Sequence, residues 1–486
     1  MSLTGRAVIA LALMAGFYAL ALAMVVFLVW IPYATAVYLR LGAGSIKLAI
    51  FCLVAAFIIV KSVLPRRDRF TPPGPELAPN RQPRLLAEIR RTAESAGQPM
   101  PAEVYLVPDV NAWVSQRGGV MGVGGRRIMG IGLALLQVLK VSELRAVIAH
   151  EFGHYHGGDV KLGPLIYRTR EALVRTVLGL ARHGGFVGKP FEWYAHLFFR
   201  VTLAVSRHQE RQADMLAARI AGPGAVARGL VTTHRAALAF RAYWASEVSS
   251  VLAAGFLPPL LPGFIRYCEA PPVAADLAAA TEQELREGKA DPYDTHPSLR
   301  ERLGALGQSD PEPGPAADPP ALTLLDSVPD LESELLTTLM RDRGAALKPL
   351  AWEQAGEAVL LPQWSTFIKD HGHKLRGLRP PEIPVLNWAV LGKELADSTG
   401  SHGHDEHLAQ FTVGAALTLL LVRQGFALDA PPGGPVILVR DGLRVEPFDL
   451  RARTIGSGAE QWRQLCAQAG IADVELGTVS DHLHGR

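Results

Sequence analysis

Two long apolar runs open the chain and predict helices that cross a membrane. Residues 7–39 contain no charged side chain, and residues 48–65 are apolar except for Lys61, which can reach the interface. A helix needs about 20 such residues to span the hydrocarbon core. A cleaved signal peptide, the alternative for the first run, fits poorly because the run is too long and lacks a clear cleavage site. We therefore expect two retained spans.

Shorter periodic segments follow and mix helical with strand-like patterns. Residues 103–107 and 128–131 alternate as short strands do. Residues 142–156 carry apolar side chains at helical spacing, with Ser142 as the expected N-cap and the glycine pair at 157–158 as the expected end. A small sheet and a helix are therefore predicted in the middle of the chain.

The last third of the chain has a pattern of its own. Residues 411–423 predict a strongly apolar helix, and 459–470 a final helix. Between them, residues 436–439 and 443–445 flank Asp441-Gly442, which predicts a β-hairpin with a tight turn. A small α+β domain is expected here.

Two proline-rich stretches suggest where the domains meet. Residues 308–321, for example, contain five prolines in 14 positions. The fold class is predicted to be mainly α (α+β). The predicted order is a transmembrane hairpin at 1–65, a linker at 66–84, a central domain at 85–307, a second linker at 308–321 and an accessory α+β domain of unknown role at 322–486.

One apolar segment of the central domain does not fit a membrane span. Residues 251–267 carry prolines at 258, 259 and 262, which a simple spanning helix would not contain. We expect a loop or lid over a cleft, a patch that contacts the membrane, or a buried loop.

Charge and cysteine content narrow the class of protein. The chain carries a net charge of +3, but residues 1–70 hold seven Lys or Arg and one Asp, all beside the apolar runs. This distribution indicates a membrane protein rather than a nucleic-acid-binding protein. The larger cluster, Lys61 with Arg66, Arg67 and Arg69, predicts that both termini and the bulk of the chain are cytoplasmic. The three cysteines form no C-x-x-C pair, so a metal site would need other ligands.

The segment that carries chemistry is His150-Glu151-Phe152-Gly153-His154. Two histidines four residues apart project from one face of a helix and can share one zinc ion. Glu151 can hold a water molecule on that zinc and accept its proton as the water attacks a carbonyl. The segment predicts a metallohydrolase site with one zinc ion per chain.

A third ligand is needed, and two routes to it can be compared. One longer motif places a histidine at position 160, where this chain has Val160. The other route uses a carboxylate from a later helix. Glu210 and Asp214 share a helix face after the amphipathic run 191–205, so Glu210 can bind zinc while Asp214 accepts the free N–H of a ligand histidine. Acidic pairs at this spacing are also common on solvated helix faces.

Taken together, these segments resemble the HtpX and CAAX-prenyl-endopeptidase family of membrane zinc peptidases, a gluzincin group. The resemblance covers about residues 85–305. It rests on Asn111-Ala112-Trp113, Gly130-Ile131-Gly132-Leu133, His150 to His154 with Asp159, Ser206-Arg207 with Glu210 and Ala213-Asp214, and Thr295 to Arg302, which includes His296-Pro297.

The resemblance implies a role for each matching residue. His150, His154 and Glu210 would bind zinc, and Glu151 would be the general base. Asp214, and with it Asp159, would orient the ligands through hydrogen bonds. His296 would polarise the substrate carbonyl or stabilise the oxyanion, although a buried structural histidine fits equally well. Asn111, Ala112 and Trp113 would bind the substrate strand, with a turn asparagine as the alternative for Asn111.

Residues 161–205 differ from some relatives, which have further membrane spans between the zinc motif and the third ligand. This stretch contains nine Lys, Arg or Glu residues and no apolar run of 18 residues. No span is expected here, which favours a cytoplasmic domain docked near the bilayer.

The sequence thus predicts a zinc endopeptidase anchored in a membrane, with protein or peptide substrates and no nucleic-acid partner. A bacterial inner membrane is the expected location, and the catalytic domain would be cytoplasmic. The substrate is expected to lie along a strand at 103–115, which pairs backbones with little selectivity and suits quality control. Two alternatives stay open: a non-catalytic scaffold that keeps the fold, and a metal-responsive regulator that uses the histidines at 402–407, otherwise a solvated loop.

Overall fold

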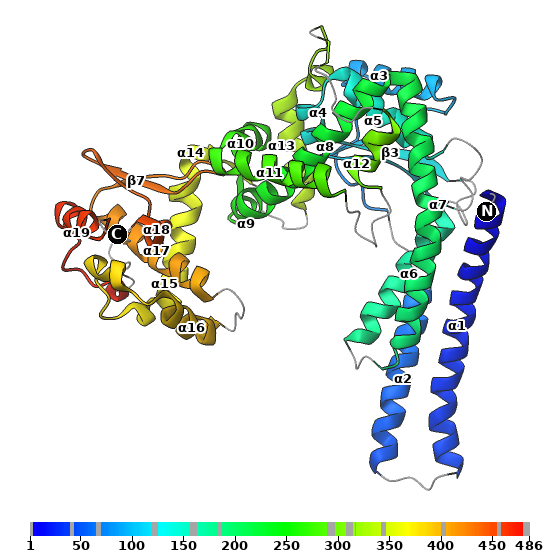
Figure 1. The fold of residues 1–486 in the computed structure, drawn as a ribbon, viewed down its shortest axis with the longest axis horizontal. Coiled ribbons are helices and arrows are strands. Elements are labelled where there is room, and N and C mark those ends of the chain that lie inside the picture. Colours follow the sequence, from blue (N-terminus) through cyan, green and yellow to red (C-terminus); the bar gives the residue numbers. More distant parts are fainter. Residues whose placement is uncertain are drawn as a thin grey trace. The chain divides into compact units, whose positions relative to one another are not determined.

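The fold is that of a computed structural model, and it is mainly helical, with three small sheets among the described residues (Figure 1). The predicted fold class is confirmed. The structure describes residues 3–38, 43–64, 70–118, 125–155, 163–182, 186–288, 297–307, 314–315, 317–341, 347–399, 405–453 and 458–479.

The chain divides into two compact units. Unit 1 comprises residues 1–237 and 280–328, and unit 2 comprises residues 238–279 and 329–486. Residues 238–279 were placed in the central domain from the sequence, but they pack with the C-terminal residues. One reason is Glu332, whose carboxylate accepts the backbone N–H groups of Leu260 and Leu261 at 2.7 and 3.0 Å.

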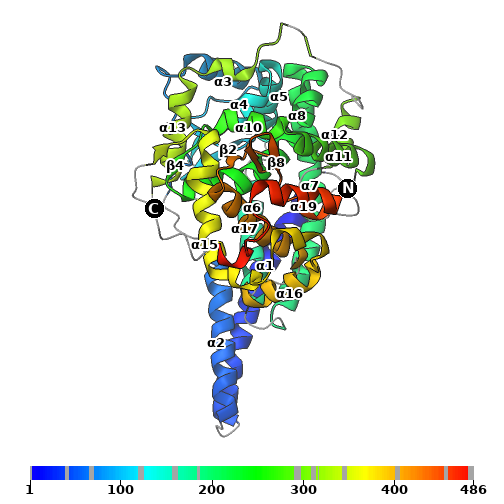
Figure 2. The ribbon, with the colours of Figure 1, turned by 90° about the vertical axis from the view of Figure 1, so that its left-hand side faces the viewer.

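Unit 1 begins with two long helices, α1 (Leu3–Tyr38) and α2 (Ala43–Val63), which run side by side (Figures 1 and 2). Their segments Leu11–Val37 and Ile46–Val63 are long and apolar enough to cross a membrane. Among the described residues these are the two candidate spans, as expected from the sequence.

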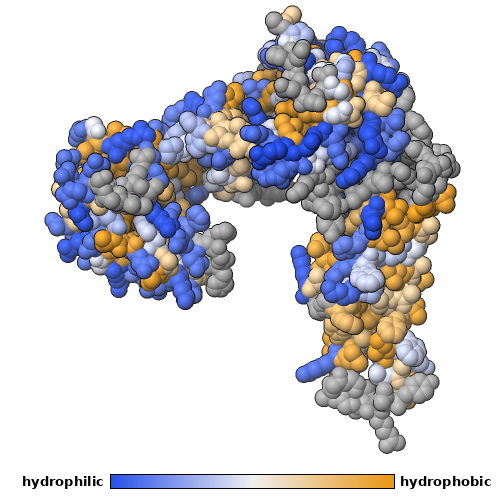
Figure 3. Space-filling view, in the orientation of Figure 1, coloured by the Kyte–Doolittle hydropathy of each residue, from blue (hydrophilic) through white to orange (hydrophobic). Residues whose placement is uncertain are grey.

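Two further helices pack along α1 and α2. They are α6 (Gly163–Ala181) and the first part of α7 (Lys189–Ala221). The four helices share one apolar core. It includes four fully buried residues: Phe17, Ile59, Leu173 and Phe198. Apolar residues also dominate the visible outer face of this bundle (Figure 3). The charged stretch 161–205 therefore contributes to the same helical bundle as the two candidate spans.

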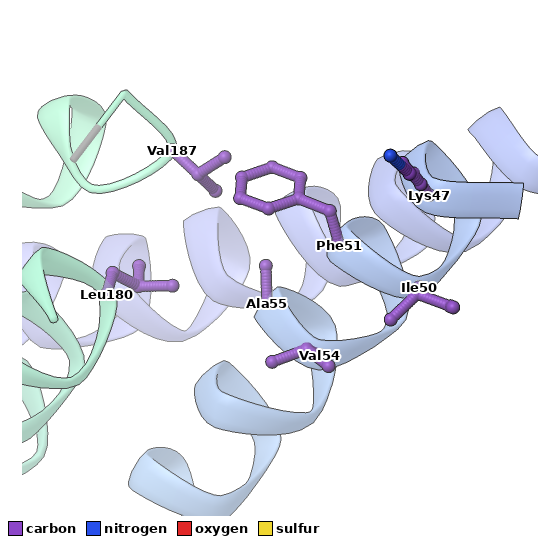
Figure 4. Close-up of a pocket in the computed structure, with 7 residues that line it drawn as sticks. All are labelled: Lys47, Ile50, Phe51, Val54, Ala55, Leu180 and Val187. Carbon is purple, nitrogen blue, oxygen red and sulfur yellow. The ribbon is translucent and has the colours of Figure 1, made fainter. Parts of the chain in front are cut away.

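A cavity of about 270 Å³ lies where the α6–α7 connection meets α2 (Figure 4). Five of its lining residues come from α2, Leu180 comes from the end of α6, and Val187 lies just before α7. Lys47 is the one charged side chain among them. The α6–α7 pair thus reaches as far along α2 as Val54 and Phe51.

A three-stranded sheet lies at the centre of the rest of unit 1. Its order is β1-β3-β2, with β1 parallel and β2 antiparallel to β3. The strands are β1 (Glu103–Val107), β2 (Ala112–Arg117) and β3 (Arg126–Gly132). The helices of this part are α3 (Pro83–Ser95), α4 (Leu133–Val138), α5 (Val141–Gly153) and α12 (Leu299–Ala305), followed by the 3-10 turn η3 (Ala321–Leu324). Helices α8 (Pro223–Tyr243) and α11 (Pro271–Glu287) each cross the boundary between the two units in the chain, at residues 237–238 and 279–280.

The expectation of one substrate strand over 103–115 is wrong. Residues 103–107 and 112–117 are separate strands on opposite sides of β3. The outer side of β1 is also covered, because Leu77 donates its N–H to Val104 and Leu106 donates to Pro75. Part of the predicted linker 66–84 therefore pairs with the sheet instead of forming a free spacer.

The start of α5 also differs from expectation. Its N-cap is Lys140, whose N–H donates to the Glu143 carboxylate at 3.0 Å. Ser142 instead donates its N–H and hydroxyl to Asp318, at 3.1 and 2.6 Å. Asp318 lies in the predicted linker 308–321, so the end of this linker is bound to α5. The expected helix end at 157–158 lies outside the described residues.

Unit 2 packs around α17 (Asp405–Arg423), whose residues Val413 to Leu421 are almost completely buried. The predicted helices at 411–423 and 459–470 and the hairpin at 436–445 are confirmed, and Asp441 and Gly442 both have positive φ in the turn. The helices are α9 (Ser249–Ala253), α10 (Leu260–Glu269), α13 (Val328–Leu339), α14 (Trp352–Ala355), α15 (Leu361–His371), α16 (Trp388–Thr399), α18 (Leu450–Arg453) and α19 (Gly458–Ala469). The strands are β4 (Phe256–Leu257), β5 (Lys348–Pro349), β6 (Ala427–Asp429), β7 (Ile437–Arg440) and β8 (Leu443–Val445). Short π or 3-10 segments span Trp244–Val248, Gly356–Leu360, Gly372–Leu375, Pro380–Val385 and Leu476–Thr478.

The apolar segment 251–267 is not a loop. It contains the end of α9, strand β4 and most of helix α10, where Pro262 lies in the first turn and costs no helical hydrogen bond. Leu260, Leu261 and Phe264 are buried in unit 2.

Candidate metal centre

The site forms where α5 and α7 pack against each other. Gly153 makes this approach possible, because a Cβ atom there would lie 2.6 Å from the Cα of Ala213 on α7. His150 and Glu151 lie in the last turn of α5, and His154 caps it. Glu210 lies on the facing turn of α7. A small residue at 153 therefore brings the histidine pair close to the carboxylate.

Three potential ligands converge at this contact. The Nε2 atoms of His150 and His154 are 3.2 Å apart. Glu210 places one carboxylate oxygen 3.5 Å from the Nε2 of His150 and the other 3.6 Å from the Nε2 of His154. Two ligand atoms bound tetrahedrally to zinc at about 2.1 Å lie about 3.4 Å apart. The donor set and its spacing therefore fit a zinc ion.

Asp214 supports this arrangement from behind. Its carboxylate lies 2.9 Å from the Nδ1 of His150, and a carboxylate can only accept, so Nδ1 carries the proton. The Nε2 of His150 is then free to face a metal. Such a bond fixes the tautomer and the orientation of a ligand histidine.

Arg302, on α12, completes the cluster, and we did not single it out from the sequence. Its guanidinium donates two hydrogen bonds to Asp214, from Nε at 2.9 Å and from Nη2 at 2.6 Å. The same Nη2 lies 3.9 Å from Glu210. The sequence signal was Arg302 at the end of the Thr295–Arg302 motif, but its partner is 88 residues away.

The buried charges alter one another's protonation. Burial alone would raise the pKa of Asp214, but its hydrogen bonds to Arg302 and His150 hold that pKa well below the usual range. Burial would lower the pKa of Arg302, but the Asp214 carboxylate, with Glu210 and Glu151, raises it. Asp214 and Arg302 therefore form a fully ionised pair beneath the ligands.

Of the residues expected to bind substrate, Ala112 and Trp113 lie on β2, and Asn111 directly precedes it. The Asn111 carbonyl accepts the N–H of Gly132 at 2.8 Å, so it faces β3. The Trp113 indole lies over Gly130, where a Cβ atom would come within 2.3 Å of it. Hydrogen-bonded and non-bonded residue pairs alternate along an antiparallel ladder, so the N–H and C=O groups of Ala112 point away from β3.

Four of the expected site residues, His150, His154, Glu210 and Asp214, meet in one cluster, and Glu151 lies beside it. Asp159 and His296 lie outside the described residues, and so do His402 and His404 of the histidine-rich segment. A further residue that we did not predict is Tyr155, which follows His154 and donates its hydroxyl to the Val114 carbonyl at 2.9 Å.

Comparison with known proteins adds the family. Residues 79–309 match the model of peptidase family M48. These residues are an M48 peptidase domain. M48 peptidases are metallopeptidases, and the M48 domain contains the whole His150, His154 and Glu210 cluster.

Curated relatives of the M48 domain are proteases by name. The chain is 30% identical over 165 residues to Protease HtpX of Yersinia enterocolitica, covering 28% of this chain and 54% of that protein. It is 26% identical over 268 residues to a Protease HtpX homolog of Desulfatibacillum aliphaticivorans, covering 51% and 76%. The match thus spans about half the length of the Yersinia protein. No solved structure matches the chain.

Proposed function

We propose that this chain is a membrane-anchored, zinc-dependent endopeptidase. The observation that carries the proposal is the convergence of His150, His154 and Glu210 at tetrahedral spacing within an M48 domain. Two apolar helices long enough to span a bilayer precede the domain, which supports the anchor.

The residues of the site would divide the work. His150, His154 and Glu210 would hold the metal, and Asp214 would keep His150 in the required tautomer. When bound, zinc would polarise the peptide carbonyl and make a water molecule more acidic. Glu151 would accept the proton of the attacking water and return it to the departing amine.

Other roles are proposed from the resemblance. His296 would polarise the carbonyl or stabilise the oxyanion, and Asp159 would support the ligands. Asn111, Ala112 and Trp113 would hold the substrate, chiefly through the outward backbone of Ala112. Backbone pairing of this kind suits unfolded proteins, and therefore a role in membrane or protein quality control.

The location is also a proposal. The positive residues that follow the second span favour a cytoplasmic catalytic domain at a bacterial inner membrane. Unit 2 has no assigned role.

The test compares the detergent-purified chain with its Glu151→Gln variant. Bound zinc and cleavage of unfolded casein are measured on the same samples. We expect about one zinc per chain in both and cleavage by the parent alone, because the amide cannot accept the proton. Glu94→Gln, exposed on α3, is the matched control and should behave as the parent.

The other outcomes have clear meanings. Zinc binding without cleavage by either protein would favour the non-catalytic scaffold. Absence of zinc from the parent would reject the ligand assignment. Cleavage by Glu151→Gln at the parent's rate would reject Glu151 as the base. Under the regulator alternative, deleting residues 402–407 would abolish a metal response, whereas the proposed peptidase would keep its activity.

A further inference from the structure

Strand β2 has an edge that pairs with no other strand among the described residues. The Gly132 N–H donates to the Asn111 carbonyl, so the backbone polar groups of this residue pair point toward each other, inside the sheet. Inward and outward pairs alternate along an antiparallel ladder. The N–H and C=O groups of Ala112 and Val114 therefore both point outward, where a substrate strand would pair.

One of these outward groups, the Val114 carbonyl, already accepts a hydrogen bond from Tyr155. Its hydroxyl donates to the Val114 carbonyl at 2.9 Å. The Arg127 guanidinium covers its ring at 4.5 Å, and Gln98 joins both residues by bonds to the Tyr155 carbonyl and to Arg127. The residue after a proposed zinc ligand is thus tied to the edge strand by its side chain.

We propose that Tyr155 determines how far a substrate can pair along β2. This inference rests on the proposed peptidase function and deepens it. The N–H of a pairing strand would approach the Val114 carbonyl to about 2.9 Å, the distance that the phenol now holds. A substrate that pairs with Ala112 alone leaves Tyr155 in place. A longer strand that also pairs with Val114 displaces the hydroxyl.

The exchange replaces one hydrogen bond of the Val114 carbonyl by another, so its effect is moderate. Removing the hydroxyl removes the competitor and leaves the carbonyl open to a long substrate. A net hydrogen bond corresponds to about 3-fold to 10-fold in an equilibrium constant. Tyr155→Phe should therefore tighten binding of long peptides by about this factor and leave short peptides unchanged.

The test uses the full chain carrying Glu151→Gln, loaded with zinc, so that bound peptides stay intact. Binding of a fluorescent, unstructured peptide is measured with and without Tyr155→Phe. A set of the same peptide with single N-methyl groups shows which substrate N–H the gain requires. Tyr105→Phe is the matched control, because its hydroxyl bonds to Glu103 on the covered strand β1.

We expect tighter binding in Tyr155→Phe alone. This gain in affinity should disappear when one particular peptide N–H is methylated. Equal or weaker binding, an equal gain in Tyr105→Phe, a gain that survives every N-methyl group, or no binding by any variant would overturn the inference.

Cleavage by chains with native Glu151 separates this inference from the proposed function. We expect a lower KM and an unchanged kcat in Tyr155→Phe. Cleavage by the parent with no binding change in Tyr155→Phe rejects the inference only. The predicted binding change without cleavage by the parent rejects the peptidase proposal only.

Discussion

Helix α7 has two halves that are buried in different ways. The bundle half, residues 189–201, packs on the apolar helices. Phe191 and Phe198 have no exposed surface, and the centroid of the Phe191 ring lies 6.4 Å from that of Phe17 on α1. The ligand half, residues 207–221, buries Glu210 and Asp214 instead. One continuous helix therefore joins the candidate membrane bundle to the metal centre.

The difference shows what each half depends on. Burial of phenylalanine needs no polar partner, because the side chain has no hydrogen-bonding group to satisfy. Burial of a carboxylate costs free energy unless a partner offsets it. In the ligand half the partners are Arg302 and the histidines, which come from other helices. The bundle half should thus affect stability alone, whereas the ligand half should affect both stability and metal binding.

Glu210→Gln should have the largest effect. The amide is a much poorer zinc ligand, so zinc affinity should fall by more than the 10-fold to 100-fold typical of lost supporting residues. Casein cleavage should disappear with it. Glu192→Gln, the same change at a partly exposed carboxylate that pairs with Lys189 in the first turn of α7, should leave both unchanged. Zinc titration of the two purified variants decides this, and normal affinity in Glu210→Gln would exclude it as a ligand.

Arg302→Met comes next. It leaves Asp214 and Glu210 buried without their guanidinium, which should cost about 3–5 kcal/mol of unfolding free energy. Zinc affinity should fall by about 10-fold to 100-fold because Asp214 no longer holds His150 firmly. If Arg302→Met proves too unstable to purify, Arg302→Lys keeps the charge but loses the two-pronged bond, and it should show a smaller loss of zinc affinity. Unchanged zinc affinity in Arg302→Lys and in any folded Arg302→Met would mean that Arg302 only stabilises the fold.

Phe191→Ala provides the contrast from the bundle half. Its cavity should cost about 3–5 kcal/mol, similar to the loss of Arg302, since the ring is fully buried. Zinc affinity of the folded protein should stay within about 2-fold of the parent, which is far below the effect of a lost supporting residue. Thermal unfolding and zinc titration in detergent measure both quantities. A loss of zinc affinity as large as in Arg302→Met would show that the two halves are coupled.

The sequence predicted the ligand half better than its surroundings. His150, His154, Glu210 and Asp214 could be chosen because each pair follows the i,i+4 spacing of a helix face, which is a local property. Arg302 could not be assigned a partner, since its bond to Asp214 depends on how α12 packs. The contact between Gly153 and Ala213 is likewise a property of two helices, not of either motif.

The fold beyond the site was predicted unevenly for the same reason. Apolar runs identified α1, α2 and α17, but apolar spacing does not say which neighbour a helix meets. The packing of α6 and α7 along α1 and α2 was therefore missed. The strand over 103–115 was read as continuous, although Pro108-Asp109 lies at the break between β1 and β2.

A buried carboxylate in unit 2 sharpens the comparison at a smaller scale. Glu332 is bound by the backbone N–H groups of Leu260 and Leu261. Burial outweighs these bonds and raises its pKa, whereas Arg302 and His150 lower the pKa of Asp214. Desolvation raises the pKa of both carboxylates, but the net shift is upward for Glu332 and downward for Asp214, because only Asp214 has a cation among its partners.

Glu332→Gln should accordingly give a small effect that grows with pH. Because the folded pKa is raised, the stability linked to Glu332 is fully present below its unfolded pKa of about 4.3 and is lost as pH rises through the folded pKa. The variant, which does not ionise, escapes this loss. Its unfolding midpoint in urea, followed by hydrogen-exchange protection of residues 260–269, should rise relative to the parent as the pH increases above about 4.3. A difference that stays constant, or that shrinks as pH rises, would mean that the two amides stabilise the Glu332 carboxylate more than burial penalises it, and the contrast with Asp214 would then fail.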